Sequence, residues 1–205
     1  MKLYDSFRAP NPRRVRWFLG EKGVSDIEII NLDLLKGEHR DQAYLAKAGL
    51  ANVPALELDD GTTITESIAI CRYLESVYPE PNMFGRDAKE TAVIEMWTRR
   101  AEMMVANPLM QTVRHTHPAL AVLEKQIPEI AASNRAMAER TLAFFDKQLA
   151  NNAFIAGERV TMADIVAIAS IDFSRMVKFQ IPEGLDNVVR WKTEMMERDA
   201  AKAGV

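Results

Sequence analysis

The sequence has little cysteine, little histidine and no long apolar segment. A single cysteine among 205 residues, Cys71, excludes an intramolecular disulfide and a thiolate metal cluster, and is typical of a reducing compartment. No apolar run approaches the roughly 18 residues that a membrane helix needs. His39, His115 and His117 show no ligand spacing with acids or cysteine, so we predict no metal site. A glycine-rich phosphate loop and a nucleophile elbow are also missing.

The charge balance argues against a nucleic-acid partner. Lys and Arg number 26 against 29 Asp and Glu, and the net charge of −3 lacks the basic excess that binding to nucleic acid requires. The first five residues, Met1–Asp5, already include an acidic residue, which is too early for the apolar core of a secretory signal peptide. We therefore expect a cytoplasmic protein that binds neither nucleic acid nor membrane, and 205 residues allow one large domain or two small ones.

Residues 1–80 alternate between short strands and helices. Asp59-Asp60-Gly61 between two alternating runs predicts a β-hairpin, and the apolar, β-branched Ile27–Leu32 predicts a buried strand. The expected strands are 2–6, 27–32, 55–58 and 62–65, and the expected helices are 12–22, 37–48 and 66–78. The order β-α-β-α-β-β-α predicts a small α/β domain with a mixed sheet.

Residues 78–85 contain two prolines and a glycine and are interpreted as a linker, after which residues 86–205 are predicted to be helical throughout. The expected helices are 86–114, with an interruption at Pro108, and 128–150, 161–176 and 187–202. Thr161 and Asp164 have the spacing of a capping box, and the helix that follows is apolar on most faces. We therefore expect that helix to be buried at the centre of its domain.

The first feature with chemical meaning is the start of the first helix. Asn11 is a favoured N-cap and Pro12 is favoured at the first helical position, so we predict that the helix begins there. Three basic residues crowd its first turn: Arg13, Arg14 and Arg16. They would attract an anion to the positive helix terminus, or else pair with Asp5 or Glu21 within the protein.

Two further segments combine polar groups with an element boundary. Val53-Pro54 opens a strand, and the backbone of Val53 would pair with an extended ligand or form an ordinary entry into the strand. Glu66-Ser67 begins a helix, where a carboxylate and a hydroxyl suit a zwitterion but serve equally as a cap. Cys71 follows among apolar neighbours and is interpreted as a small buried hydrophobe.

These segments occur together in one family, and the whole chain resembles a cytosolic glutathione S-transferase. The similarity is greatest to the bacterial and fungal branch typified by the second glutathione transferase of yeast. The motifs that carry it are Pro10–Arg16, Leu35–His39, Val53-Pro54, Thr65–Ile70 and Thr161–Asp164. The resemblance implies a thioredoxin-like glutathione-binding domain over residues 1–80, followed by an all-helical domain over 86–205 that contributes the electrophile pocket.

The resemblance also implies how glutathione, the co-substrate, is held. Glu66 and Ser67 would hold its γ-glutamyl end, and the Val53 backbone would pair with its cysteinyl part, with Pro54 in a cis peptide as support. His39 would contact the glycyl end, and Asn52 stands where many relatives have Lys or Gln.

The position that activates the thiol departs from the family pattern. The theta-type serine would fall on Pro10, which has nothing to donate, and Ser6 is the nearest hydroxyl in the sequence. His115 is the position most similar to a histidine that assists through water in the yeast-like branch. Ser6, Asn11 and His115 are therefore the catalytic candidates.

The predicted function is the conjugation of glutathione to small apolar electrophiles, a detoxification reaction, in a homodimer without a metal. The expected electrophile pocket lies near Met103, Met104 and His115. The alternative is a glutathione-binding or ligand-carrying protein with little turnover. Glutathione-dependent disulfide reduction is disfavoured because no cysteine lies near residues 6–16.

Overall fold

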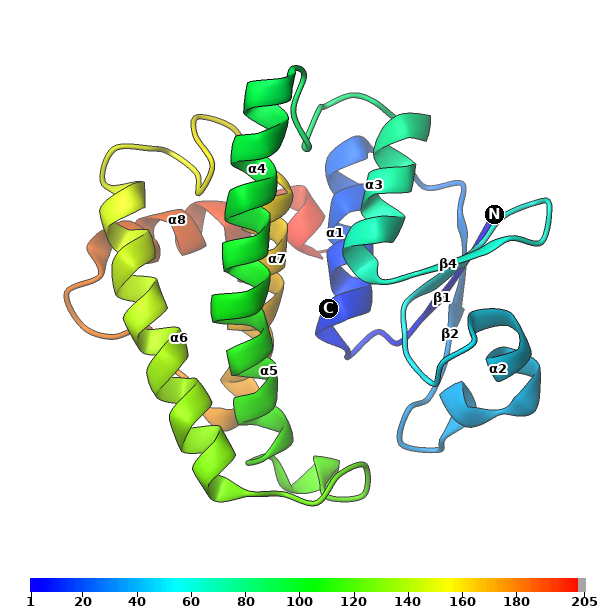
Figure 1. The fold of residues 1–205 in the computed structure, drawn as a ribbon. Helices are drawn as coiled ribbons and strands as arrows, with labels where there is room; N and C mark the ends of the chain where they lie inside the picture. The colour runs from blue at the N-terminus through cyan, green and yellow to red at the C-terminus, as the bar shows by residue number, and fades with distance from the viewer. Residues whose placement is uncertain (203–205) are drawn as a thin grey trace. The chain divides into compact units, whose positions relative to one another are not determined.

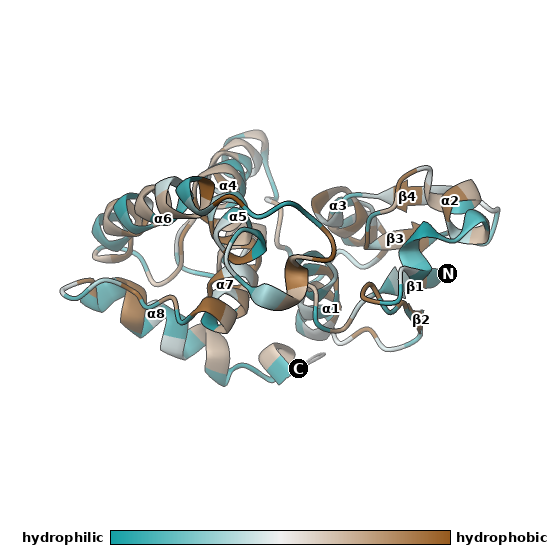
Figure 2. Cartoon of the chain, turned by 90° about the horizontal axis from the view of Figure 1, so that it is seen from below, coloured by the Kyte–Doolittle hydropathy of each residue, from teal (hydrophilic) through white to brown (hydrophobic). Residues whose placement is uncertain are grey.

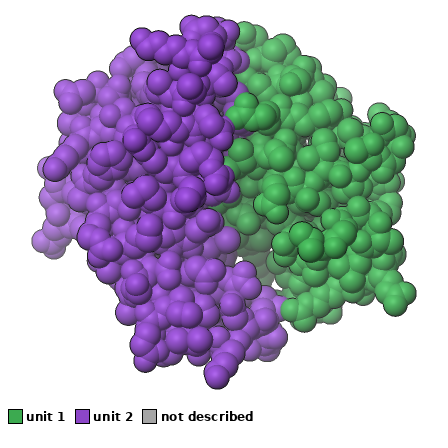
Figure 3. All heavy atoms as spheres, in the orientation of Figure 1, with its two compact units in different colours: residues 1–81, 199–205 green, residues 82–198 purple. Residues whose placement is uncertain are grey.

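The computed structural model describes residues 1–202, which divide into two compact units (Figure 3). The first unit comprises residues 1–81 and the described residues from 199 onward, and the second comprises residues 82–198. The sequence pattern places the segment from residue 199 in the helical part, whereas in the structure this segment groups with the first unit. The last three residues of the predicted range 86–205 lie outside the described residues.

The first unit is built on a mixed four-stranded sheet, as predicted (Figure 1). Its strands are β1 (Lys2–Asp5), β2 (Glu28–Asn31), β3 (Ala55–Glu57) and β4 (Thr63–Thr65). Their order is β2-β1-β3-β4, in which only β1 and β2 are parallel. The hairpin between β3 and β4 is confirmed, and Gly61 in its turn takes a positive φ of 86° that favours glycine.

The prediction of a strand within residues 27–32 is confirmed, but the prediction that this strand is buried is wrong. The strand exists as β2, but it lies at an edge of the sheet, and Ile29 is 42% exposed. Apolar and β-branched residues indicate a strand whether it is central or at an edge, so composition alone could not place it.

The helices of the first unit are α1 (Pro10–Lys22), α2 (Gln42–Ala48) and α3 (Ser67–Val77), with short 3-10 segments η1 (Glu38–Arg40) and η5 (Asp199–Lys202). Helices α1 and α3 pack together on one side of the sheet, and α2 lies on the other (Figure 1). Gly23 ends α1 in the left-handed conformation, as its position predicted. The core includes Leu3, Phe18, Leu56 and Ile70, all fully buried.

The second unit is helical. It contains α4 (Ala88–Ala101), the π-helical η2 (Glu102–Ala106), α5 (Asn107–Arg114), η3 (Pro118–Leu120), α6 (Pro128–Leu149), α7 (Met162–Phe173), η4 (Ser174–Val177) and α8 (Asp186–Glu197). The expected interruption at Pro108 takes the form of η2, because a proline cannot donate to the carbonyl one turn earlier. Among the described helices, none has the length and apolar character to cross a membrane.

Helix α7 is the central helix of the second unit, and the capping box at its start is confirmed. Thr161 and Asp164 exchange both hydrogen bonds of the box. Residues 162–172 are all buried, and the helix is predominantly brown in Figure 2. It contacts α4, α5 and α8, so an apolar surface on every side is what its position requires.

Candidate functional site

Three chain segments leave the sheet of the first unit at the same end. Tyr4 in β1 pairs with Ala55 in β3, and Ala55 in turn pairs with Thr65 in β4. Both pairings are antiparallel, so the segments that follow β1 and β4 and the segment that precedes β3 lie at the same end of the sheet, and they carry Ser6, Ser67 and Val53 within two residues of the last pairs. The sheet therefore brings together one catalytic candidate and two predicted binding residues that are far apart in the sequence.

Val53 lies just outside the ladder, which begins at Ala55, and the Val53–Pro54 peptide is cis. The Val53 side chain packs on a buried cluster of Tyr4, Tyr44 and Ala55. This packing fixes the position of Val53 and leaves its backbone at the rim of the sheet.

The Tyr44 hydroxyl donates a hydrogen bond to the backbone carbonyl of Asn52. Burial, together with the neighbouring Tyr4, raises the pKa of Tyr44 to about 12, so the phenol keeps its proton and remains a donor. Tyr44 has little local signal in the sequence: it is one aromatic residue on a short helix made mostly of alanine and leucine.

Glu66 and Ser67 stand at the start of α3. Glu66 occupies the N-cap position with a positive φ of 68°, but its exposed side chain makes no capping hydrogen bond. Such a backbone conformation costs a non-glycine residue on the order of 1–3 kcal/mol and is common at ligand sites. Ser67 is the first helical residue and is only 4% exposed. The alternative that Glu66 is simply a cap is therefore not supported.

The three arginines of α1 are all buried, and they face different partners. Arg16 forms an ion pair with Asp5, so the internal pairing considered above holds for this arginine. Glu21 accepts a hydrogen bond from the Trp17 indole. The other two contacts are Arg13 Nη2 to the Ala201 carbonyl and Arg14 Nη1 to Ser67 Oγ, both at 3.3 Å.

The prediction that Asn11 caps α1 is wrong. The helix begins at Pro10, so Asn11 is its second residue and Pro12 its third. The prolines lack N–H groups, and the Arg13 N–H donates to the Ala9 carbonyl at 3.3 Å. This terminus therefore offers an anion fewer backbone donors than expected. The Asn11 Oδ1 atom is buried and has no hydrogen-bond partner within residues 1–202.

His39 lies in η1 and is 7% exposed. Burial, with a smaller contribution from the charge of Arg40, lowers the pKa of its imidazole. Its Nδ1 atom is buried without a hydrogen-bond partner in the described part of the chain. The ring is therefore neutral at neutral pH and has hydrogen-bonding capacity left for a ligand.

His115 belongs to the second unit, where it follows α5 directly. Its Nδ1 accepts a hydrogen bond from the Ile127 backbone N–H at 3.2 Å, and Nε2 lies 3.9 Å from Glu124 Oε1. With Nδ1 engaged, only Nε2 is left for any other interaction.

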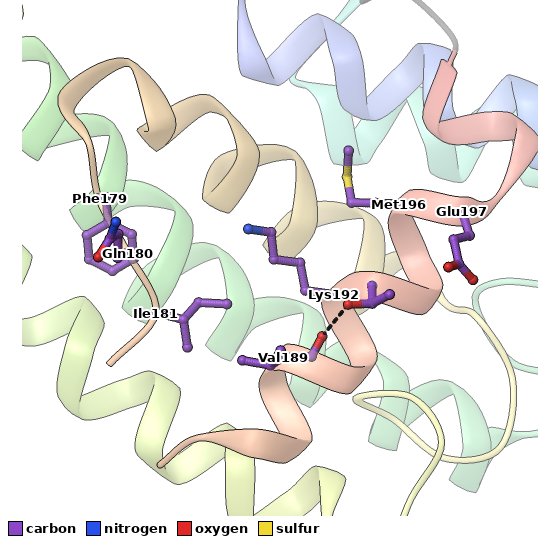
Figure 4. A pocket seen from close by; sticks show the side chains of 8 residues that line it. Phe179, Gln180, Ile181, Val189, Lys192, Met196 and Glu197 are labelled. Atoms are coloured by element: carbon purple, nitrogen blue, oxygen red, sulfur yellow. Dashed lines mark hydrogen bonds between the residues drawn. The ribbon is translucent and has the colours of Figure 1, made fainter. Parts of the chain in front are cut away.

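An open hollow of about 470 Å³ lies in the second unit (Figure 4). It is lined by Phe179, Gln180, Ile181, Val189, Lys192, Thr193, Met196 and Glu197. The dashed line in Figure 4 is the hydrogen bond from Thr193 Oγ1 to the Val189 carbonyl, at 3.0 Å. The lining includes none of the residues expected near the electrophile, and Met103 is 54% exposed. No group of three potential metal ligands is found among residues 1–202.

Comparisons with known proteins point to the same family in both halves of the chain. Residues 9–77 match the family model of the glutathione S-transferase N-terminal domain, and residues 102–199 match that of the C-terminal domain. Glutathione S-transferase 2 of Saccharomyces cerevisiae is 36% identical over 205 residues, covering 98% of this chain and 88% of the relative. The crystal structure of Gtt2 from the same yeast aligns with a TM-score of 0.93 at 35% identity, covering all of both chains. A glutathione S-transferase domain-containing protein of Marinobacter aquaeolei has a TM-score of 0.93 at 38% identity, covering 98% of this chain and 99% of its own.

Proposed function

The chain belongs to the glutathione S-transferase family, and we propose that it transfers glutathione, as the thiolate, to small apolar electrophiles. The observation that carries this proposal is that the segments bearing Ser6, Val53 and Ser67 lie at the same end of the sheet. We place glutathione binding in residues 1–80 and assign the electrophile pocket to residues 86–205.

Each end of glutathione has a complementary group in the first unit. The exposed Glu66 carboxylate suits the ammonium of the γ-glutamyl end, and the Ser67 hydroxyl suits its carboxylate. The Val53 backbone would pair with the cysteinyl part in the manner of an added strand. His39 and Asn52 would contact the glycyl end.

The chemical step needs the thiolate. A free thiol has a pKa of about 8.5, and lowering it by about two units requires roughly 2.7 kcal/mol of preferential stabilisation of the thiolate. A hydrogen bond to a charged acceptor contributes about 1.5–3 kcal/mol, so two donors from Ser6 and Asn11 would be sufficient. The thiol proton passes to water, the sulfur lone pair forms the new C–S bond, and the displaced electron pair leaves with the leaving group or opens a ring or double bond.

His115 is proposed in a supporting role through Nε2. Since Nδ1 accepts the Ile127 N–H, the neutral ring carries its proton on Nε2 and would act there as a donor to water or sulfur. Detoxification, a cytoplasmic location and a homodimer complete the proposal.

The alternative is a glutathione-binding carrier with little turnover, and the departure at Pro10 from the theta-type serine favours it. One experiment separates the two functions. The full chain is applied to immobilised glutathione and then assayed with halogenated aromatics, epoxides and enals. Retention with turnover supports the transferase, retention without turnover across the panel supports the carrier, and no retention contradicts both.

The groups that handle the thiol are tested by ultraviolet absorbance of the thiolate in the complex. We expect bound glutathione to ionise at a lower pH than free glutathione. Ser6→Ala and Asn11→Ala should each move the titration back toward the free value, and Asn187→Ala, on α8, is the control. Identical titrations for bound and free glutathione would contradict this mechanism.

A further inference from the structure

The hollow in the second unit has the size and the lining of a small-molecule site (Figure 4). Its volume of about 470 Å³ falls within the range of roughly 300–1,000 Å³ that is usual for ligand pockets. Four of its eight lining side chains are apolar: Phe179, Ile181, Val189 and Met196. None of the eight belongs to the residues proposed above to bind glutathione or to act on its thiol. The proposed function therefore leaves this hollow without a role.

One wall of the hollow is fixed by backbone hydrogen bonds at the end of η4. Lys178 takes the left-handed conformation with a φ of 55°, and its N–H donates to the Arg175 carbonyl at 2.9 Å. The next N–H, that of Phe179, donates to the Ser174 carbonyl at 3.3 Å. This pair of hydrogen bonds is a common way to end a helix, and it sets the direction of the chain that carries Phe179 and Ile181.

Side-chain contacts outside the hollow hold both walls. On the first wall, the guanidinium of Arg135 in α6 lies 5.2 Å from the centroid of the Phe179 ring, and Arg135 Nε donates to Glu139 at 3.0 Å. The second wall is α8, which is anchored by the buried side chains of Trp191 and Met195. The hollow is therefore formed without a ligand, as most small-molecule sites are.

Lys192 supplies a positive charge at the apolar part of the hollow. It lies on α8 and is partly buried, and its ammonium has no hydrogen-bond or ion-pair partner within residues 1–202. In Figure 4 the amine extends from α8 toward the segment that carries Phe179 and Ile181. Glu197, the acidic residue of the lining, is exposed to solvent, so its charge is screened more strongly than that of Lys192.

These features match a ligand that has one negative charge and an apolar body. A carboxylate beside Lys192 would form a charge-assisted hydrogen bond. The body would cover the apolar side chains, among which the flexible thioether of Met196 adapts to different shapes. The N–H groups of Gln180 and Ile181 donate no hydrogen bond within the described residues, so they also remain available to a ligand. A second negative charge would find no second lysine or arginine in the lining.

We propose that this hollow is a second ligand site, which binds small apolar monocarboxylates through Lys192. The site belongs to the second unit alone, and the inference does not depend on the proposed function. A carboxylate bound there would leave the glutathione site open.

The test compares two ligands that differ in charge and share one ring system. The full chain is titrated calorimetrically with 1-naphthaleneacetate and with the neutral 1-naphthaleneacetamide, each with and without saturating S-hexylglutathione to block the conjugation site. We expect saturable binding of both compounds under both conditions, with the carboxylate preferred by roughly fivefold, as for a partly exposed ion pair. The preference should shrink when NaCl is raised from about 0.02 M to about 0.5 M.

Two pairs of matched variants assign the binding to this hollow. Lys192→Gln should bind the two naphthalene compounds equally, whereas Lys89→Gln, which removes an exposed lysine of α4, should keep the native preference. Val189→Ser should weaken both compounds by a similar factor, whereas Val122→Ser should weaken neither. Val189 and Val122 are both exposed, so these substitutions leave the core intact.

Several results would overturn the inference. The native chain might show no saturable binding, or equal affinity for the carboxylate and the amide. Binding that is lost when S-hexylglutathione is present would place the compounds in the conjugation site instead. A preference that survives in Lys192→Gln, or that falls equally in Lys89→Gln, would show that Lys192 does not recognise the carboxylate.

Discussion

Asp5 and Arg16 form an ion pair inside the first unit, with the Asp5 side chain fully buried and that of Arg16 only 4% exposed. Arg16 also donates to the Phe7 carbonyl at 2.9 Å, so it holds the segment that runs from β1 to α1. This segment contains Ser6, so the ion pair helps to fix the position of this catalytic candidate.

The ion pair predicts that a single substitution lowers the free energy of unfolding much more than a double substitution does. Asp5→Asn leaves the buried charge of Arg16 without its carboxylate and should lower the free energy of unfolding by about 3–5 kcal/mol. The double variant Asp5→Leu/Arg16→Met should cost much less, because neither charge of the buried pair is left. Chemical denaturation of the native protein and the two variants measures this, and a loss in the double variant as large as that in Asp5→Asn would contradict the interpretation.

Gly85 and Gly61 allow a matched test of backbone strain. Both have a positive φ, but a Cβ at Gly85 would clash with the backbone nitrogen of Thr91, whereas a Cβ at Gly61 has no atom within 4 Å. Gly61→Ala should cost about 1 kcal/mol from its backbone conformation, and Gly85→Ala about 3 kcal/mol or more. Equal changes in urea midpoint for the two variants would show that the close approach is relieved at no cost.

Asp164 should contribute far more to stability than an ordinary helix cap. Its fully buried carboxylate accepts hydrogen bonds from the backbone N–H groups of Ile155 and Thr161 and from the Trp191 indole, at 2.8–2.9 Å. Asp164→Ala leaves these donors unsatisfied and should cost more than about 3 kcal/mol. Asp87, the side-chain cap of α4, is the control, and its replacement by Ala should cost about 1 kcal/mol. Similar losses in thermal unfolding would contradict this ranking.

His39 should make stability depend on pH on the acid side. Burial and Arg40 lower the pKa of the folded ring, so below about pH 6.5 the unfolded chain takes up a proton that the folded ring does not. Stability should therefore fall as the pH drops from about 6.5 toward the folded pKa, and this part of the decline should disappear in His39→Gln. Arg40→Gln should narrow the pH range over which stability falls, because the charge of Arg40 helps to lower the pKa of His39. If stability declines with falling pH in His39→Gln as it does in the native chain, this ring does not contribute to the pH dependence.

Local sequence patterns predicted most elements of both units, because these elements carry local signals. Asp-Gly specified the hairpin, Gly23 the end of α1, and Thr161 with Asp164 the start of α7. The errors arose where two local preferences competed. Asn11 is a good cap, but Pro10 is equally suited to a first helical turn, and the helix begins there.

Other features depend on tertiary contacts that no local pattern encodes. The edge position of β2 follows from the order of the sheet, and the grouping of residues 199–202 with the first unit follows from packing of η5 on α1. The position of Val53 and Ser67 at the same end of the sheet follows from the antiparallel pairing of β3 with β4. The resemblance to the family supplied the roles proposed for these residues.

The central claim is that glutathione is held at the end of the sheet where Val53 and Ser67 meet. Calorimetric titration of the full chain with glutathione tests it most directly, with Ser67→Ala as the variant and Ser76→Ala, on the exposed side of the same helix, as the control. The account predicts saturable binding to the native and Ser76→Ala proteins and an affinity lower by roughly tenfold or more in Ser67→Ala. No saturable heat with the native chain, or equal affinities in all three proteins, would contradict it.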